Sequence, residues 1–239
     1  MKFVKSWIFI FIVFTSINTF GQVNKQDGNS FWREYIVEIM PKINLEDVTL
    51  SSKENHLRIW TGNPIIEVWK VGNNAKGQIT YWVKEVVPSK EEDTNRYYST
   101  KDYLDSNQCN KIMNIASKYS IYTLPSDDGI SNWMHGLDGI TYFIETKQNN
   151  TYRLKTYWTP TAQDGVKEAE VVQSFIDDVL QAVDAENRMN YFQIGNPFYS
   201  WTNNGASVIS RILPYDRYWK MKRERNRYRK QKEELQKAK

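Results

Sequence analysis

Cysteine and histidine are scarce in this chain of 239 residues, and their scarcity excludes several kinds of site. Cys109 is the only cysteine, so no intrachain disulfide can form, and its place on an apolar helical stripe predicts a small buried side chain. His56 and His135 are the only histidines. Because zinc sites draw their ligands largely from Cys and His, the sequence predicts no metal site. His56 stands beside a predicted strand, where a surface or strand-end histidine is expected.

Short catalytic motifs are also missing. The chain contains no Gly-x-Ser-x-Gly nucleophile turn, no His-Glu-x-x-His zinc motif, no phosphate-binding glycine loop and no dinucleotide-binding fingerprint. The sequence therefore predicts neither a catalytic set with a familiar spacing nor a cofactor.

No apolar run has the length of a membrane span. The longest, Trp7 to Ile17, is about half of the roughly 20 residues that a transmembrane helix needs. Lys2 and Lys5 precede it, and Thr19 to Gly21 places small residues where a signal peptidase reads. Residues 1–21 are therefore predicted to be a signal peptide, with an uncleaved N-terminal anchor as the alternative. No cysteine adjoins the cleavage position, so a periplasmic or secreted protein without a lipid anchor is expected.

Hydrophobic periodicity predicts an α+β fold. Hairpins are predicted at residues 65–87 and 140–158, and helices near residues 30–41, 106–119 and 162–187. This order favours an antiparallel sheet of two hairpins, with four to five strands, covered on one face by about three helices.

The mature chain divides by composition into four parts. They are a linker (residues 22–28), the α+β domain (29–187), an aromatic-rich arm packed on the domain (188–213) and a basic tail (214–239). The tail has strong helix formers but no apolar stripe, so a solvated helix and a disordered segment are both open.

The register of the second hairpin is predicted from its alternation. Pairing even-numbered with even-numbered residues keeps one face apolar and the other mixed, and it places Arg153 opposite Phe143 or Glu145. A slip by one residue would turn Arg153 toward the core, so the even-to-even register is expected.

The stretch SDDGISNWMHGLDGITYFIE, residues 126–145, gathers titratable side chains around two Asp-Gly steps. Turn chemistry is the favoured interpretation, because Asp accepts hydrogen bonds from nearby backbone and Gly supplies a positive φ. A ligand-contacting loop is the second interpretation. The third is a hydrolase in which Asp128, His135 and Glu145 act as acid and base, with Asp138 orienting His135.

The loop at residues 126–138 and the arm at residues 191–201 are the predicted contact surfaces, since an exposed aromatic patch marks a partner or ligand. The predicted ligand-contacting residues are Asp127, Asp128, Trp133, His135, Asp138, Tyr191, Phe198, Tyr199 and Trp201.

Charge is unevenly divided along the chain. Residues 211–239 contain twelve Lys and Arg against four Asp and Glu, whereas the whole chain has a net charge of +4, so residues 1–210 carry a net charge of −4. An exported protein rarely meets nucleic acid, so an anionic lipid or lipopolysaccharide surface, or an acidic partner, is the expected target. The basic residues concerned are Arg217, Lys220, Lys222, Arg223, Arg225, Arg227, Arg229 and Lys230. A tail that only aids solubility is the alternative.

The run DGITYFIE followed by YRLKTYWTP resembles the sheet of a family of small exported proteins of Gram-negative bacteria, and the FGQ end of the signal peptide is similar to theirs. The resemblance covers about residues 124–183 and implies no established activity. A weaker likeness links the strand pair after the Asp-Gly turn to compact α+β inhibitor and immunity proteins. Neither likeness brings catalytic residues to this chain.

These patterns predict an exported binding or interaction module of the bacterial envelope, which acts by steric and electrostatic recognition. Its partner is expected to be a protein or another envelope component. A component of an envelope assembly, docked by the basic tail, is a further possibility.

Export makes a prediction about the mature N-terminus. We expect intact-mass measurement of the exported protein to give a chain that begins at Gln22, because Gly21 ends the cleavage motif. A chain that keeps Met1 and stays in the membrane fraction would instead indicate the uncleaved anchor.

Overall fold

The computed structural model describes residues 30–87, 94–203 and 207–237, so the predicted signal peptide and linker lie outside the described residues. The helices are α1 (Ser30–Ile39), α2 (Ser106–Lys118), α3 (Lys167–Ala182), α4 (Ala185–Gly195) and α5 (Tyr215–Lys237), with 3-10 turns η1 (Met40–Ile43), η2 (Asp127–Gly129) and η3 (Pro160–Ala162). The strands are β1 (Glu54–Trp60), β2 (Ile65–Val71), β3 (Asn74–Glu85), β4 (Tyr97–Leu104), β5 (Thr141–Gln148), β6 (Thr151–Trp158), β7 (Ser200–Thr202) and β8 (Ile209–Ser210). The α+β class is confirmed, although four to five strands and three helices understate it.

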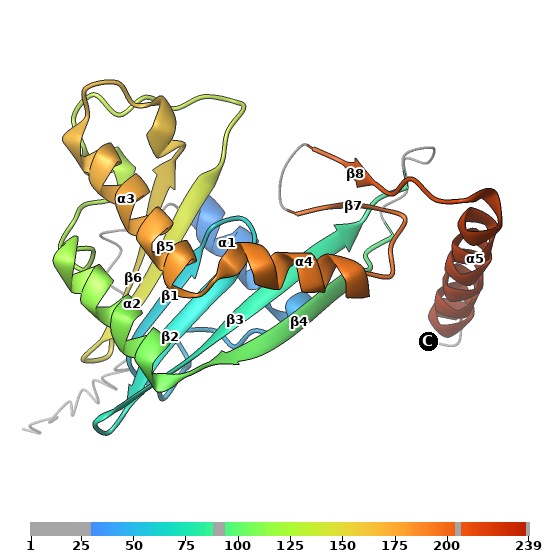
Figure 1. Cartoon of the computed structure of the whole chain (residues 1–239), viewed down its shortest axis with the longest axis horizontal. Helices are drawn as coiled ribbons and strands as arrows, with labels where there is room; N and C mark the ends of the chain where they lie inside the picture. Colours follow the sequence, from blue (N-terminus) through green and yellow to red (C-terminus); the bar gives the residue numbers. More distant parts are fainter. Residues whose placement is uncertain (1–29, 88–93, 204–206, 238–239) are drawn as a thin grey trace, which may run out of the picture.

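The strands form one antiparallel sheet in the order β6-β5-β1-β2-β3-β7-β8, with β4 paired to the other side of β3 (Figure 1). The two predicted hairpins, β2–β3 and β5–β6, are both present, and β1 joins them by pairing with β2 and β5. β4 was not predicted because its sequence, YYSTKDYL, is polar and largely solvent-facing, as suits a strand at a sheet edge.

Helices cover both faces of the sheet, so the expected single covered face is wrong. On one face, α2 and α3 pack on side chains such as Leu57 and Ile144. On the other, α1 and η1 pack on Trp60, Trp82 and Phe143, and Figure 1 shows α1 behind the sheet with α2, α3 and α4 in front. Both faces need a cover because the central strands β1 and β2 have buried residues on both of them.

The even-to-even register of the second hairpin is also wrong. Asn149 and Asn150 form a two-residue turn, both at positive φ (48° and 62°), as a type I′ turn requires. This turn pairs Gln148 with Thr151, which sets even residues opposite odd ones and places Arg153 opposite Thr146. Turn geometry, rather than alternation along the strands, decides the register here.

The register has a consequence for β6. It turns Lys155 into the α2 and α3 side of the sheet, where its side chain is buried. The ammonium donates hydrogen bonds to the carbonyl oxygens of Ile121, Tyr122 and Leu124, which follow α2. A buried cation is tolerated at this position because three backbone oxygens solvate it.

The predicted helix at residues 162–187 is broken in two. Gly165 at φ 72° precedes α3, and Asp184 at φ 53° separates α3 from α4. α4 then runs to Gly195, so the first part of the predicted irregular arm is helical. Within the described ranges, no helix combines the length and the apolar character that a membrane span requires.

The β5–β6 turn gives a test of the register at one residue. Asn150→Val is expected to lower the free energy of unfolding by about 1–2 kcal/mol, because a β-branched residue resists positive φ. Asn150→Gly is the matched control and should leave that free energy within about 0.5 kcal/mol, since glycine suits the same turn position. Equal losses in the two variants, measured by urea unfolding, would contradict a left-handed residue at this position.

Candidate functional site

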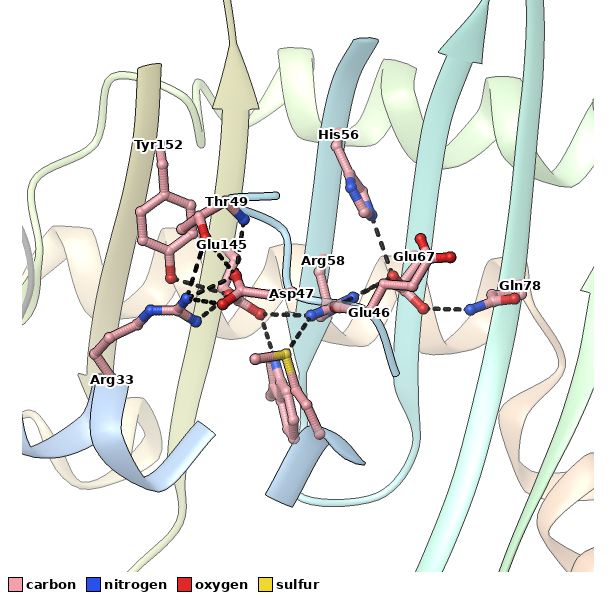
Figure 2. Close-up of polar contacts among 12 residues, drawn as sticks. Arg33, Glu46, Asp47, Thr49, His56, Arg58, Glu67, Gln78, Glu145 and Tyr152 are labelled. Carbon is pink, nitrogen blue, oxygen red and sulfur yellow. Dashed lines mark hydrogen bonds and ion pairs between the residues drawn. The ribbon is translucent and has the colours of Figure 1, made fainter. Parts of the chain in front are cut away.

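A buried ionic cluster occupies the α1 side of the sheet. Arg58 on β1 has two partners in the strand register, Glu67 on β2 and Glu145 on β5. Its Nη2 lies 2.7 Å from Glu67 Oε1, and its Nη1 lies 3.3 Å from Glu145 Oε2 (Figure 2). All three side chains are at most 1% exposed. Three neighbouring strands are therefore tied by one guanidinium.

Glu145 has several further partners. Its Oε2 accepts a hydrogen bond from Trp60 Nε1 at 2.8 Å, and its Oε1 accepts one from the Tyr152 hydroxyl at 2.9 Å. Arg33 Nη1, from α1, lies 3.7 Å from Oε1, and Arg33 also pairs with Asp47. The side chain proposed as a catalytic acid is thus a bonded, buried part of the fold.

Glu67 has two further partners besides Arg58, which are His56 and Gln78. His56 Nε2 lies 3.1 Å from Glu67 Oε1, and Gln78 donates to Oε2. His56 lies near the start of β1, as the strand-end alternative predicted, but it is fully buried and packs edge-on against Trp69, so the surface alternative is wrong. The bulge near Asn55 changes the β1 register between Glu54 and Leu57, just where His56 enters the sheet.

The cluster keeps Glu67 in its charged form. Burial raises the pKa of Glu67, but Arg58 and the hydrogen bonds from His56 and Gln78 outweigh burial and hold the pKa of Glu67 below its ordinary range. Burial also raises the pKa of the Tyr152 phenol, and the Glu145 charge adds to this, so Tyr152 stays a neutral donor. The side chains of the cluster are almost completely buried, so a substrate cannot reach them. Their role is therefore within the fold.

The Asp-rich stretch divides into separate parts. Asp127 is 2% exposed and accepts hydrogen bonds from Thr156 Oγ1 at 2.6 Å and from Trp158 N at 2.8 Å. Asp128 N also donates to it, at 3.0 Å. Asp127 therefore caps the outer edge of β6, in line with the turn-chemistry interpretation.

His135 approaches this edge cap from the following loop. Its Nε2 lies 3.3 Å from Asp127 Oδ2 and 3.8 Å from Asp128 Oδ1. His135 is half-exposed and Asp128 is more exposed still, so the face of the cluster opposite β6 is open to solvent. Asp138 is exposed and contributes none of the ion pairs found there, while Glu145 lies in the buried cluster on another strand. Of the three residues in the hydrolase interpretation, the structure thus brings Asp128 and His135 together but not Glu145.

The glycines of this loop serve packing and not positive φ. Gly129, Gly136 and Gly139 are absent from the residues at positive φ, so the expected role of the Asp-Gly glycines is wrong. A Cβ on Gly136 would lie 2.7 Å from the Trp158 ring, and one on Gly139 would lie 2.0 Å from Thr159 Oγ1. The loop bearing His135 therefore lies directly on β6.

The predicted aromatic contact residues are mostly anchors. Trp133 is buried and donates from Nε1 to Trp158 O at 3.0 Å. Phe198 and Trp201 are buried in the core on the α2 and α3 side. Tyr199 is half-buried, with its ring centroid 5.0 Å from that of Tyr218 on α5. Of the predicted arm residues, Tyr191 is the one whose side chain is largely exposed.

The basic tail is a helix, α5, that lies beyond β7 and β8 at the end of the molecule (Figure 1). Its half-buried side includes Tyr218, Met221 and Arg225. Arg96, on the segment before β4, lies over the Tyr228 ring, 4.5 Å from its centroid. One side of α5 is thus held against the body, and the disordered alternative is not what the described residues adopt.

Lys220, Arg223, Arg227 and Lys230 are exposed on the opposite side of α5. Their spacing of three, four and three residues keeps them on one helical face and spreads them over about 15 Å. No ion pair was found for any described side chain of α5, so this cationic face is turned to solvent without a carboxylate partner. We call these four residues the cationic face.

Comparison of this chain with known proteins found no matching family model, curated protein or solved structure. The chemistry of its surfaces is therefore the basis for any functional assignment.

The sequence interpretation missed the buried cluster, although a signal was present. Arg58 and Glu67 each interrupt an otherwise apolar strand, LRIW and IIEVW, at neighbouring positions of the sheet. A charge in the middle of an apolar strand needs a partner of opposite sign, and a search for such pairs would have found this one.

Removing the central cation tests the buried cluster. Arg58→Met is expected to lower the free energy of unfolding by about 3–5 kcal/mol at neutral pH, because Glu67 and Glu145 would keep buried, unpaired charges. Adding Glu67→Gln to this variant should recover part of the loss. Chemical unfolding at a series of pH values would measure both effects.

The pH dependence has a definite sign. A lowered pKa of Glu67 in the folded protein stabilises it above the unfolded pKa of about 4.3, and this contribution is lost as the pH falls toward the folded pKa. In Arg58→Met, protonation relieves the unpaired carboxylates instead. Because burial raises the pKa of an unpaired carboxylate, the difference between parent and variant should shrink as the pH falls from neutral, and a constant difference would contradict the assignment.

Proposed function

We propose that this protein is an exported binding module of the bacterial envelope that docks on an anionic phospholipid surface through the cationic face of α5. The observation that carries the proposal is a row of four exposed Lys and Arg side chains without carboxylate partners, on a helix whose other side is held by the body. A fixed helix presents its charges together, so docking does not require the tail to order on binding.

The charge distribution supports a defined orientation on such a surface. Residues 211–239 contain twelve Lys and Arg against four Asp and Glu, whereas residues 1–210 have a net charge of −4. An anionic membrane attracts α5 and repels the rest of the chain, so the sheet points away from the lipid. Each Lys or Arg near such a surface contributes about 1 kcal/mol, and four of them contribute about 4 kcal/mol.

Aromatic side chains add a modest apolar contribution. Tyr215 and Trp219 are exposed, lie one helical turn apart, and flank the cationic face. Tyr and Trp favour the headgroup level of a bilayer. The helix has no broad apolar face, so we expect surface adsorption and not deep insertion.

The hydrolase alternative loses one of its three residues. Asp128 and His135 approach each other, but both carboxylate oxygens of Glu145 are bonded in the buried cluster. What Asp128 and His135 support is an open polar site on the loop.

Vesicle binding tests the proposed docking. We expect the full chain to sediment with vesicles of phosphatidylglycerol and phosphatidylcholine but not with pure phosphatidylcholine. Replacing Lys220, Arg223, Arg227 and Lys230 by Gln should weaken binding about a hundredfold or more, since about 4 kcal/mol of attraction is removed. Binding should also be lost near 1 M salt, where the screening length is about 3 Å.

A matched control removes the same number of positive charges from the body of the protein. Lys70, Lys76, Lys111 and Lys167 are exposed on the body, and their joint replacement by Gln should leave vesicle binding unchanged or slightly weaker. Equal losses in the two quadruple variants would show that net charge alone acts. Sedimentation of neither parent nor variants would remove the lipid surface as the target and leave an acidic protein partner.

A further inference from the structure

The loop cluster on β6 has the geometry of a metal site, although its spacing in the sequence did not predict one. We infer that Asp127, Asp128 and His135 bind one divalent transition-metal ion, of the Zn²⁺ type, through Asp127 Oδ2, Asp128 Oδ1 and His135 Nε2. Each of the three side chains offers one ligand atom, and these atoms all lie within 4.8 Å of one another. The inference is independent of α5 and of the proposed membrane docking.

The distances fit a small tetrahedral ion. Bond lengths of about 2.0–2.2 Å from Zn²⁺ to imidazole nitrogen and carboxylate oxygen put two tetrahedral ligands about 3.3–3.5 Å apart. His135 Nε2 lies 3.3 Å from Asp127 Oδ2, and 3.8 Å from Asp128 Oδ1. Asp128 is exposed, so a small rotation of its side chain closes the remaining gap.

Asp127 is a ligand that the fold has already positioned. It is 98% buried, and donors from outside the cluster fix its two oxygens: Thr156 Oγ1 on Oδ1 and Trp158 N on Oδ2. Hydrogen bonds of this kind orient metal-binding carboxylates in proteins. They leave a lone pair of Oδ2 for the ion, on the side where His135 lies.

The position of His135 is fixed as well. Gly136 lies against the Trp158 ring, and the His135 and Trp158 ring centroids are 6.5 Å apart. Met134, on the other side, donates its backbone N–H to Gln163 Oε1 at 2.8 Å and accepts from Gln163 Nε2 at 3.0 Å. The imidazole is thus carried on a short segment that is bound to the body at both ends.

The ligand set selects the kind of ion. One imidazole with two carboxylates suits Zn²⁺ and its neighbours, whereas Ca²⁺ needs six to eight oxygens and Mg²⁺ keeps most of its water. Three protein ligands with an open side leave a coordination position for water or a small anionic ligand, as in open rather than structural zinc sites. The exposed face of His135 and Asp128 supplies that open side.

Equilibrium dialysis of the full, tag-free chain against Zn²⁺ alone tests the inference, with bound metal measured by mass spectrometry. We expect the parent to bind one Zn²⁺ per chain. Asp128→Asn and His135→Gln should each bind Zn²⁺ at least about tenfold more weakly than the parent. These two side chains are exposed, so neither variant is expected to unfold, which circular dichroism would verify. Asp127→Asn is less informative because Asp127 also caps β6.

Asp138→Asn is the matched control, since Asp138 is an exposed carboxylate on the same loop that lies outside the cluster. It should bind Zn²⁺ as the parent does. Failure of the parent to retain Zn²⁺, or equal retention by the parent and His135→Gln, would overturn the site. In parallel dialyses against Ca²⁺ and against Mg²⁺, binding of either ion by a parent that does not bind Zn²⁺ would overturn the assigned class of ion.

Discussion

The ion pairs of Arg58 with Glu67 and Glu145 are the constraint on which the sheet depends. Removing a charged group from water costs several kcal/mol per ion, so these side chains are tolerated only while they stay together. They lie opposite one another on β1, β2 and β5, and a shift of any of these strands would separate them. The cluster therefore helps to fix the register of β1 with β2 and of β1 with β5.

The same cluster explains why α1 covers the second face. Arg58 needs more acceptors than two carboxylates supply, and it donates to Glu46 O and contacts Met40 Sδ, both in the segment that follows α1. Arg33 on α1 adds the pair with Asp47. The N-terminal segment is thus attached by polar contacts at the centre and by apolar packing around them.

The buried charged groups and the exposed candidate sites lie in different parts of the molecule. The ion pairs of Arg58 are buried inside the fold, while the two candidate sites that are open to solvent lie at two ends of it. One is the loop that caps β6, where a carboxylate needed for the edge also faces His135. The other is α5, held by Tyr199 and Arg96 with its cationic face turned outward (Figure 1).

The sequence by itself determined the α+β class, the two hairpins, the helix with Cys109 and the division between an acidic body and a basic tail, because periodicity and composition are local properties. Only the tertiary structure decided which charged residues meet. Glu145 looked like a partner of His135 because it is ten residues away, yet β5 carries it to Arg58. The pairing of β1 with β5, which are far apart in the sequence, made that choice, since contact depends on register and not on separation along the chain.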